Sequence, residues 1–196
     1  MRTTYNFLLF MLIALATASL FSKKGEGFTA SGLRGLKYYT VDSNLLCAMA
    51  CLCCAFGGDH HWIVVLRFVG TVAVLVTMLI VIFLLVPAFG MKAMFTGRDF
   101  VLHLAAPLIA VITFCFYEEN IDLSEAFWGT ISVLVYGVCY LLNILKNGIE
   151  ENDWYGFAQY GVKQKLMPLK AFWLVEVMLF TLFAYLLSLG LYAIHP

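Results

Sequence analysis

Thr40 and His103 are the residues of this chain whose types and positions best suit catalysis. Thr40 opens one long apolar segment, and His103 lies near the start of another. A threonine hydroxyl becomes a nucleophile when a nearby base takes its proton, and a neutral imidazole is such a base near pH 7. Brought together just below the lipid headgroups, the two side chains would hold the minimum equipment of an ester hydrolase.

The composition indicates an integral membrane protein. Hydrophobic residues make up 63% of the 196 residues, and only 12% are charged. A soluble domain has a lower apolar share and about 25% charged residues, so a soluble globular protein is excluded. The formal net charge of zero gives no electrostatic basis for binding nucleic acid.

Six apolar stretches come close to the roughly 20 residues that a helix needs to cross a bilayer. They cover residues 5–21, 40–56, 62–86, 100–117, 127–145 and 171–194. We expect the third to stop at Pro87, and the first to be retained because residues 20–22 make a poor signal-peptide cleavage site. The predicted fold class is an all-α integral membrane protein, a bundle of six transmembrane helices forming one domain over residues 1–196.

Positive charge is unevenly divided between the loops on the two sides of this bundle. Of the 12 lysine and arginine residues, all except Arg2 and Arg67 fall in the loops after the first, third and fifth helices. Positively charged loops usually stay in the cytoplasm. The sequence therefore predicts that both termini face outward, that Thr40 and His103 lie on the cytoplasmic side, and that Arg67 extends to the outer headgroups.

Counting the membrane crossings places three polar residues in the same leaflet. The second, fourth and sixth helices all begin on one side, with Thr40 at the start of the second. His103 lies about 6 Å into the fourth at 1.5 Å per residue, and Glu176 just under two turns into the sixth. Ionisable groups at such depth usually face the bundle interior and are functional candidates. The structural alternatives are a hydrogen-bonded histidine and a protonated carboxyl that joins two helices.

Three further residues are candidates for supporting roles. Asp99 precedes His103 by four residues, so it can share its helix face and orient the ring, or cap the helix start. Asn44 lies one turn beyond Thr40 and is a candidate donor to the oxyanion of an acyl-transfer reaction, as are backbone amides at the same helix start. Ser43 lies beside Asn44.

Two other features have a structural and a functional interpretation. Four of the six cysteines cluster at Cys47, Cys51, Cys53 and Cys54, where small side chains suit helix contacts better than a metal site, so we expect no metal. The loop over residues 146–170 contains Trp154 and Tyr155, which either anchor it at the membrane surface or form a lid over a site.

The chain resembles a family of six-helix membrane proteins, the androgen-induced-gene and androgen-dependent tissue-factor-pathway-inhibitor-regulating proteins, and is most similar to their bacterial relatives. Two motifs carry the resemblance, Tyr39-Thr40-Val41-x-Ser43-Asn44-Leu45 and Asp99-x3-His103-x3-Pro107-Leu108. It extends from the first helix through at least the fifth.

The resemblance implies a threonine hydrolase that cleaves a lipid ester, similar to fatty acid esters of hydroxy fatty acids, in a bacterial cytoplasmic membrane. Thr40 would be the nucleophile and His103 the general base, without a cofactor. We expect the two side chains within hydrogen-bonding reach of each other in a lipid-accessible hollow. The alternatives are a small transporter or channel, and a non-catalytic lipid-binding or scaffold protein. The sequence identifies no protein partner.

Overall fold

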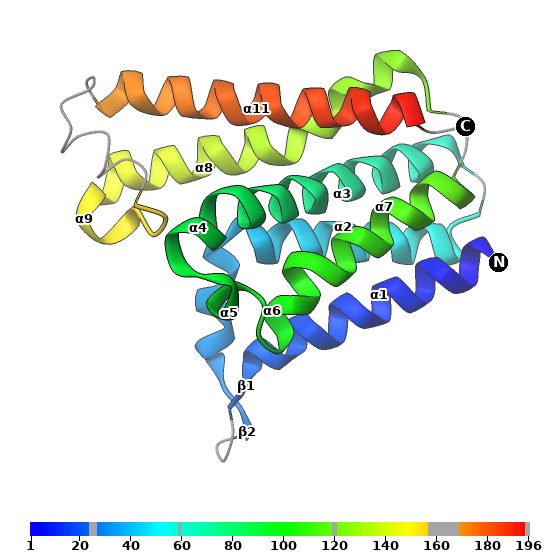
Figure 1. Ribbon diagram of the computed structural model, residues 1–196, viewed down its shortest axis with the longest axis horizontal. Helices are drawn as coiled ribbons and strands as arrows, with labels where there is room; N and C mark the ends of the chain where they lie inside the picture. The colour runs from blue at the N-terminus through cyan, green and yellow to red at the C-terminus, as the bar shows by residue number, and fades with distance from the viewer. Residues whose placement is uncertain (24–26, 59, 119–120, 157–168, 195–196) are drawn as a thin grey trace.

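The protein is a bundle of membrane-length helices, as the sequence predicted. The computed structural model describes residues 1–23, 27–58, 60–118, 121–156 and 169–194. Within these ranges six helices are long and apolar enough to cross a membrane. They lie side by side, with both chain ends at one end of the bundle and the short connecting elements α5, α9 and the hairpin at the other (Figure 1). This arrangement confirms the all-α membrane fold.

The membrane-length helices have the following bounds. They are α1 (Arg2–Ala18) with η1 (Ser19–Phe21), α2 (Tyr39–Phe56), α3 (His61–Ile80) continued by η3 (Val81–Leu85) and α4 (Val86–Phe89), α6 (Arg98–Phe100) continued by η4 (Val101–Ala105) and α7 (Ala106–Tyr117), η5 (Leu123–Thr130) with α8 (Ile131–Asn147), and α11 (Leu169–Ile194). The connecting elements are β1 (Ser22–Lys23), β2 (Gly27–Phe28), η2 (Ala30–Lys37), α5 (Met91–Met94) and α9 (Ile149–Asn152).

Two of the spans widen into a π-helical turn just before a proline. η3 precedes Pro87, and η4, which contains His103, precedes Pro107. Proline lacks an N–H, and its ring crowds the carbonyl four residues earlier, so a wider turn relieves the clash. The third span therefore continues through Pro87 to Phe89, and the expected stop at residue 86 is wrong. In the fourth span the Ala106 N–H donates five residues back, to Val101, and the Leu102 carbonyl accepts a side-chain hydrogen bond from Asn44.

Small residues bring α2 and α3 together closely. A β-carbon added at Gly70 of α3 would lie 2.9 Å from the α-carbon of Cys47, so only glycine fits there. Cys47, Cys51 and Cys54 are buried in this contact. Within the described part of the chain, no group of three or more histidine, cysteine or acidic residues could hold a metal ion. The burial of these cysteines at the close α2–α3 contact gives them the role of small residues in helix packing.

Arg67 lies inside the bundle, and the expectation that it extends to the headgroups is wrong. Its side chain is fully buried and donates to Asn6 Oδ1 at 2.8 Å, to Thr113 Oγ1 at 2.9 Å and to the hydroxyl of Thr71. Asn6 in turn donates to Glu118 Oε1 at 2.9 Å. The guanidinium has five N–H groups that need partners away from water, and α1, α3 and α7 supply most of them, with Cys47 Sγ of α2 at 3.9 Å from Nη1. Burial of the group therefore ties these four helices together.

Candidate active site

Thr40 lies between two hollows at the end of the bundle away from the chain termini. One hollow, of about 90 Å³, is enclosed by α2, α3, α8 and α11; we call it the apolar cavity. The other, of about 580 Å³, is bounded by η2, α2, α5 and η4; we call it the polar hollow. Thr40, Leu85 and Tyr155 line both. The threonine side chain therefore borders an apolar and a polar compartment at once.

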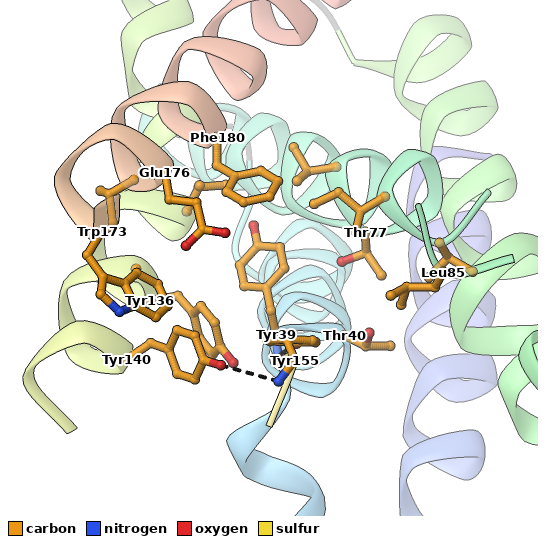
Figure 2. Close-up of a pocket in the computed structure, with 16 residues that line it drawn as sticks. Tyr39, Thr40, Thr77, Leu85, Tyr136, Tyr140, Tyr155, Trp173, Glu176 and Phe180 are labelled. Carbon is orange, nitrogen blue, oxygen red and sulfur yellow. Dashed lines mark hydrogen bonds between the residues drawn. The ribbon is translucent and has the colours of Figure 1, made fainter. Parts of the chain in front are cut away.

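The apolar cavity is walled by aromatic rings and aliphatic side chains. Figure 2 shows Thr40 and Leu85 toward one side and Trp173 toward the other, with the carboxyl group of Glu176 pointing into the space between. The ring-bearing residues of the wall are Tyr39, Tyr136, Tyr140, Tyr155, Trp173 and Phe180. Glu176 Oε2 is buried and has no hydrogen-bond partner among the described residues. The cavity wall is otherwise mostly apolar, and among the described residues that line it Glu176 has the one carboxyl group.

The polar hollow contains the charged residues of the site. His103 and Asp99 line it together with three basic residues, Arg34, Lys37 and Arg98. Thr40 and His103 thus border one hollow, as parity placed them at one end of the bundle. Two basic residues come from η2 and one from α6, so separate loops meet at this hollow.

The imidazole of His103 is held by a backbone carbonyl. Its Nδ1 lies 2.7 Å from the carbonyl oxygen of Met94, which is the last residue of α5. A carbonyl oxygen only accepts, so Nδ1 carries the hydrogen and Nε2 of the neutral ring carries the lone pair. Carbonyls at a helix end lack an intrahelical donor, which is why this one takes the imidazole. The ring therefore presents a basic nitrogen opposite its anchor.

The expected hydrogen bond between Thr40 and His103 is not formed in this structure. Across the described residues, no hydrogen bond joins the Thr40 hydroxyl to either ring nitrogen, although the two side chains border one hollow. One ring nitrogen of His103 is bound to the Met94 carbonyl. Thr40 and His103 also belong to separate elements, since α2 follows η2 and η4 follows α6. Catalytic hydrogen bonds in empty sites are often long or poorly aligned, and a single water can relay the proton. The structure therefore shows that the two residues, both within its described part, border one hollow, and it shows no direct hydrogen bond between their side chains.

Asn44 and Ser43 hold Thr40 in place. Asn44 is fully buried, and its Nδ2 donates to the carbonyl of Thr40 at 2.8 Å and to that of Leu102 at 3.0 Å. Both amide hydrogens are used, so none is left for an oxyanion, and the structure gives Asn44 a positioning role instead. Ser43 donates to the same Thr40 carbonyl at 3.1 Å and shares a 2.7 Å hydrogen bond with Thr77 of α3.

Asp99 and Glu176 are in different environments from those expected. Gly97, and not Asp99, occupies the cap position before α6. The Asp99 carboxylate lies 3.7 Å from Arg98, and among the described residues it makes no hydrogen bond to His103, whose Nδ1 is already bound to Met94. Glu176 shares the apolar cavity with Thr40 but does not line the polar hollow. Neither carboxylate therefore orients the imidazole.

Trp154 and Tyr155 close the end of the site. The Tyr155 hydroxyl accepts the backbone N–H of Tyr39 at 2.9 Å, and its own N–H donates to the Tyr140 hydroxyl at 3.3 Å. Trp154 packs on Tyr140 with ring centroids 4.5 Å apart. Burial raises the pKa of the Tyr155 phenol far above its ordinary value, so this hydroxyl stays neutral. The rest of the loop, residues 157–168, lies outside the described residues.

The aromatic wall was not predicted from the sequence. Tyr136 and Tyr140 lie on α8, four residues apart, and Trp173 and Glu176 lie on one face of α11. The sequence does contain a signal for this wall. Aromatic residues with a polar end recur at helical spacing on spans that are otherwise aliphatic. Such residues also mark membrane interfaces, so only the fold distinguishes a cavity wall from an anchor.

No known protein family, curated protein or solved structure matches the chain. The resemblance stated from the sequence is therefore carried by its two short motifs alone.

Proposed function

We propose that the protein hydrolyses the ester bond of a membrane lipid, with Thr40 as nucleophile and His103 as general base. One observation supports this above the others. The Thr40 side chain lies where the apolar cavity meets the polar hollow, and His103 lines that same hollow with its basic nitrogen away from its anchor. An ester lipid bound with its acyl chain in the cavity and its polar part in the hollow would present its carbonyl at Thr40.

The chemistry is acyl transfer to water in two steps. His103 Nε2 takes the Thr40 hydroxyl proton through one water, and Thr40 Oγ1 attacks the ester carbonyl carbon. The tetrahedral intermediate expels the alcohol, which receives the proton from the imidazolium, and an acyl-threonine remains. Water from the polar hollow then attacks the acyl-threonine, again with His103 as base. The fatty acid leaves, and the Thr40 hydroxyl is restored.

The start of α2 supplies a donor for the developing oxyanion. Thr40 is the second residue of this helix, so its backbone N–H lies in the first turn, before the amides of Val41 and Asp42 that donate to the Tyr38 carbonyl. An amide of the nucleophile's own residue serves this purpose in serine hydrolases. A single oxyanion donor is typically worth about 3–4 kcal/mol of transition-state stabilisation.

The position of the site also suits the substrate. The Leu, Val and Phe side chains of the apolar cavity are compatible with an acyl chain, whereas the charged residues of the hollow keep it wet. Hydrolysis of the acyl-threonine needs that water. We place this end of the bundle at the cytoplasmic face, with both termini outside, on the basis of the loop charges.

Covalent labelling tests the assignment. A fluorophosphonate carrying a long alkyl chain should phosphonylate Thr40 in purified protein, located by mass spectrometry of the labelled peptide. Labelling should disappear in Thr40→Ala and fall strongly in His103→Asn, whose amide can still donate to the Met94 carbonyl. The matched control is Thr96→Ala, an exposed threonine at the same end whose hydroxyl bonds Lys92.

Three results would contradict the proposal. Undiminished ester hydrolysis by Thr40→Ala would exclude Thr40 as nucleophile. A bound lipid that stays intact in the wild-type protein would favour the non-catalytic lipid-binding alternative, and solute flux through the protein in liposomes would favour a transporter.

A further inference from the structure

Helices α8 and α11 form a wall with a hollow on each side. The apolar cavity lies on the inner side. On the outer side, a groove of about 570 Å³ runs between the two helices; we call it the lateral groove. Its lining includes Leu134, Val138 and Leu141 of α8 and Leu174, Met178 and Leu182 of α11. Leu174, Met178 and Leu182 are more than half exposed.

The wall between the cavity and the groove is thin. On α8 the cavity residues Val133 and Gly137 are each followed directly by a groove residue, so the two sets occupy neighbouring helix faces. On α11, Val177 lines both spaces. A β-carbon added at Gly137 would lie 3.1 Å from Val177 Cγ2. Where Val177 meets Gly137, therefore, the valine isopropyl group against the glycine backbone separates the apolar cavity from the lateral groove.

The groove faces the acyl chains of the bilayer. Both helices are membrane-length, and the six groove residues named above are all aliphatic or methionine. Lipid tails fill the hydrocarbon layer around such helices. The groove shares the side chain of Val177 with the cavity that reaches Thr40, and its apolar lining makes a lipid tail its fitting occupant.

We propose that the acyl chain of a membrane lipid enters the apolar cavity sideways from the bilayer, between α8 and α11, with Val177 and Gly137 as the gate. The inference deepens the proposed function, because the cavity it fills is the one assigned to the substrate's acyl chain. The entry route can be tested separately from the reaction, because an acyl chain enters the cavity or stays outside whether or not its ester is cleaved.

Photo-crosslinking in a bilayer tests the route. The protein, as Thr40→Ala to prevent turnover, is placed in nanodiscs containing phosphatidylcholine with a diazirine midway along one acyl chain. Crosslinks mapped by mass spectrometry should fall on cavity residues such as Val133 and Phe180 and on groove residues such as Met178. Gly137→Val should lower the cavity crosslinks about tenfold, equivalent to about 1.4 kcal/mol, as overpacking at a tight contact does, and should leave the groove crosslinks unchanged.

Two companion variants separate gating from misfolding. Val177→Ala removes the isopropyl group and should raise the cavity crosslinks without adding any volume to the wall. Val135→Phe adds volume on an exposed face of α8, outside both the cavity and the groove, and should leave the pattern unchanged.

Three outcomes would overturn the inference. They are cavity crosslinks unchanged by Gly137→Val, cavity crosslinks not raised by Val177→Ala, and groove residues crosslinked to a second copy of the protein in place of lipid. Failure of the proposed hydrolysis would be visible separately, as ester cleavage retained by Thr40→Ala with the crosslinking pattern intact.

Discussion

Asn44 donates one amide group to two carbonyl oxygens, those of Thr40 at 2.8 Å and Leu102 at 3.0 Å. Leu102 precedes His103 in the π-helical turn η4. A single buried side chain therefore fixes the distance between the helix that holds the proposed nucleophile and the turn that holds the proposed base. The Ser43–Thr77 hydrogen bond fixes the same helix against α3. Asn44, Ser43 and Thr77 thus position the site, and none of them takes part in a step of the proposed reaction.

Replacing His103 by asparagine should slow hydrolysis and leave the fold intact. The asparagine amide can still donate to the Met94 carbonyl, which His103 Nδ1 binds at 2.7 Å, but it cannot accept a proton. We expect the rate to fall about 10²–10⁴-fold, the usual contribution of a general base, with the midpoint of thermal unfolding unchanged. The measurement is turnover of a lipid ester in detergent micelles. A rate within twofold of wild type would remove the base assignment.

Replacing Asn44 by leucine should cost both stability and activity. The buried Leu102 carbonyl loses its side-chain donor, which costs about 1–3 kcal/mol, whereas the Thr40 carbonyl keeps the Ser43 hydroxyl. The free energy of unfolding should therefore fall by about 1–3 kcal/mol, and turnover per folded molecule should fall with it as Thr40 loses its link to η4. Asn143→Leu is the control, because Asn143 lies away from the site and bonds Asn152. Equal effects of the two substitutions would contradict the positioning role.

Replacing Arg67 by methionine should destabilise the bundle without changing the chemistry. The guanidinium joins α1, α3 and α7, and breaking a buried network by removing one partner costs about 3–5 kcal/mol. Arg67 lies in the first half of α3 and lines neither the apolar cavity nor the polar hollow. Thermal unfolding should show the loss, while turnover per folded molecule stays at the wild-type level. Arg98→Met, at an exposed ion pair, should shift stability by less than about 1 kcal/mol.

Replacing Glu176 by leucine should stabilise the protein. Its Oε2 is buried and, within the described residues, lacks a hydrogen-bond partner, and an unsatisfied buried polar group costs about 1–3 kcal/mol. Leucine removes that cost and fills part of the apolar cavity, so the unfolding midpoint should rise. Glu176→Gln, which keeps a polar end of similar shape, should give a much smaller change. A lower midpoint for the leucine variant would mean that the carboxyl has a stabilising partner.

The stability of the protein should fall at alkaline pH, partly through Tyr155. Burial holds the pKa of this phenol above its unfolded value of about 10, so the folded state keeps a proton that the unfolded state releases. The stability contribution is complete below about pH 10 and is lost as pH rises further. Tyr155→Phe should make the decline shallower by at most about 1.4 kcal/mol per pH unit, measured by denaturation at pH 9–11. Parallel slopes for the two proteins would contradict the burial.

The sequence by itself determined the membrane fold. Long apolar spans leave only helices as a way to satisfy backbone hydrogen bonds in lipid, so the six spans follow from composition and spacing, although the third continues past Pro87 to Phe89. Parity then put Thr40, His103 and Glu176 at one end of the bundle. These inferences depend on local properties, namely hydropathy and rise per residue, which neighbouring helices do not alter.

Only the tertiary structure decided how the helices pack and which polar groups meet. It buried Arg67, whose partners come from α1 and α7, and it gave both amide hydrogens of Asn44 to carbonyls on two helices. It also built the cavity wall from aromatic residues that the sequence could equally assign to a membrane interface. The physical reason is that a polar side chain in lipid bonds whichever group the helix rotations bring near, and those rotations are set by packing across the whole bundle.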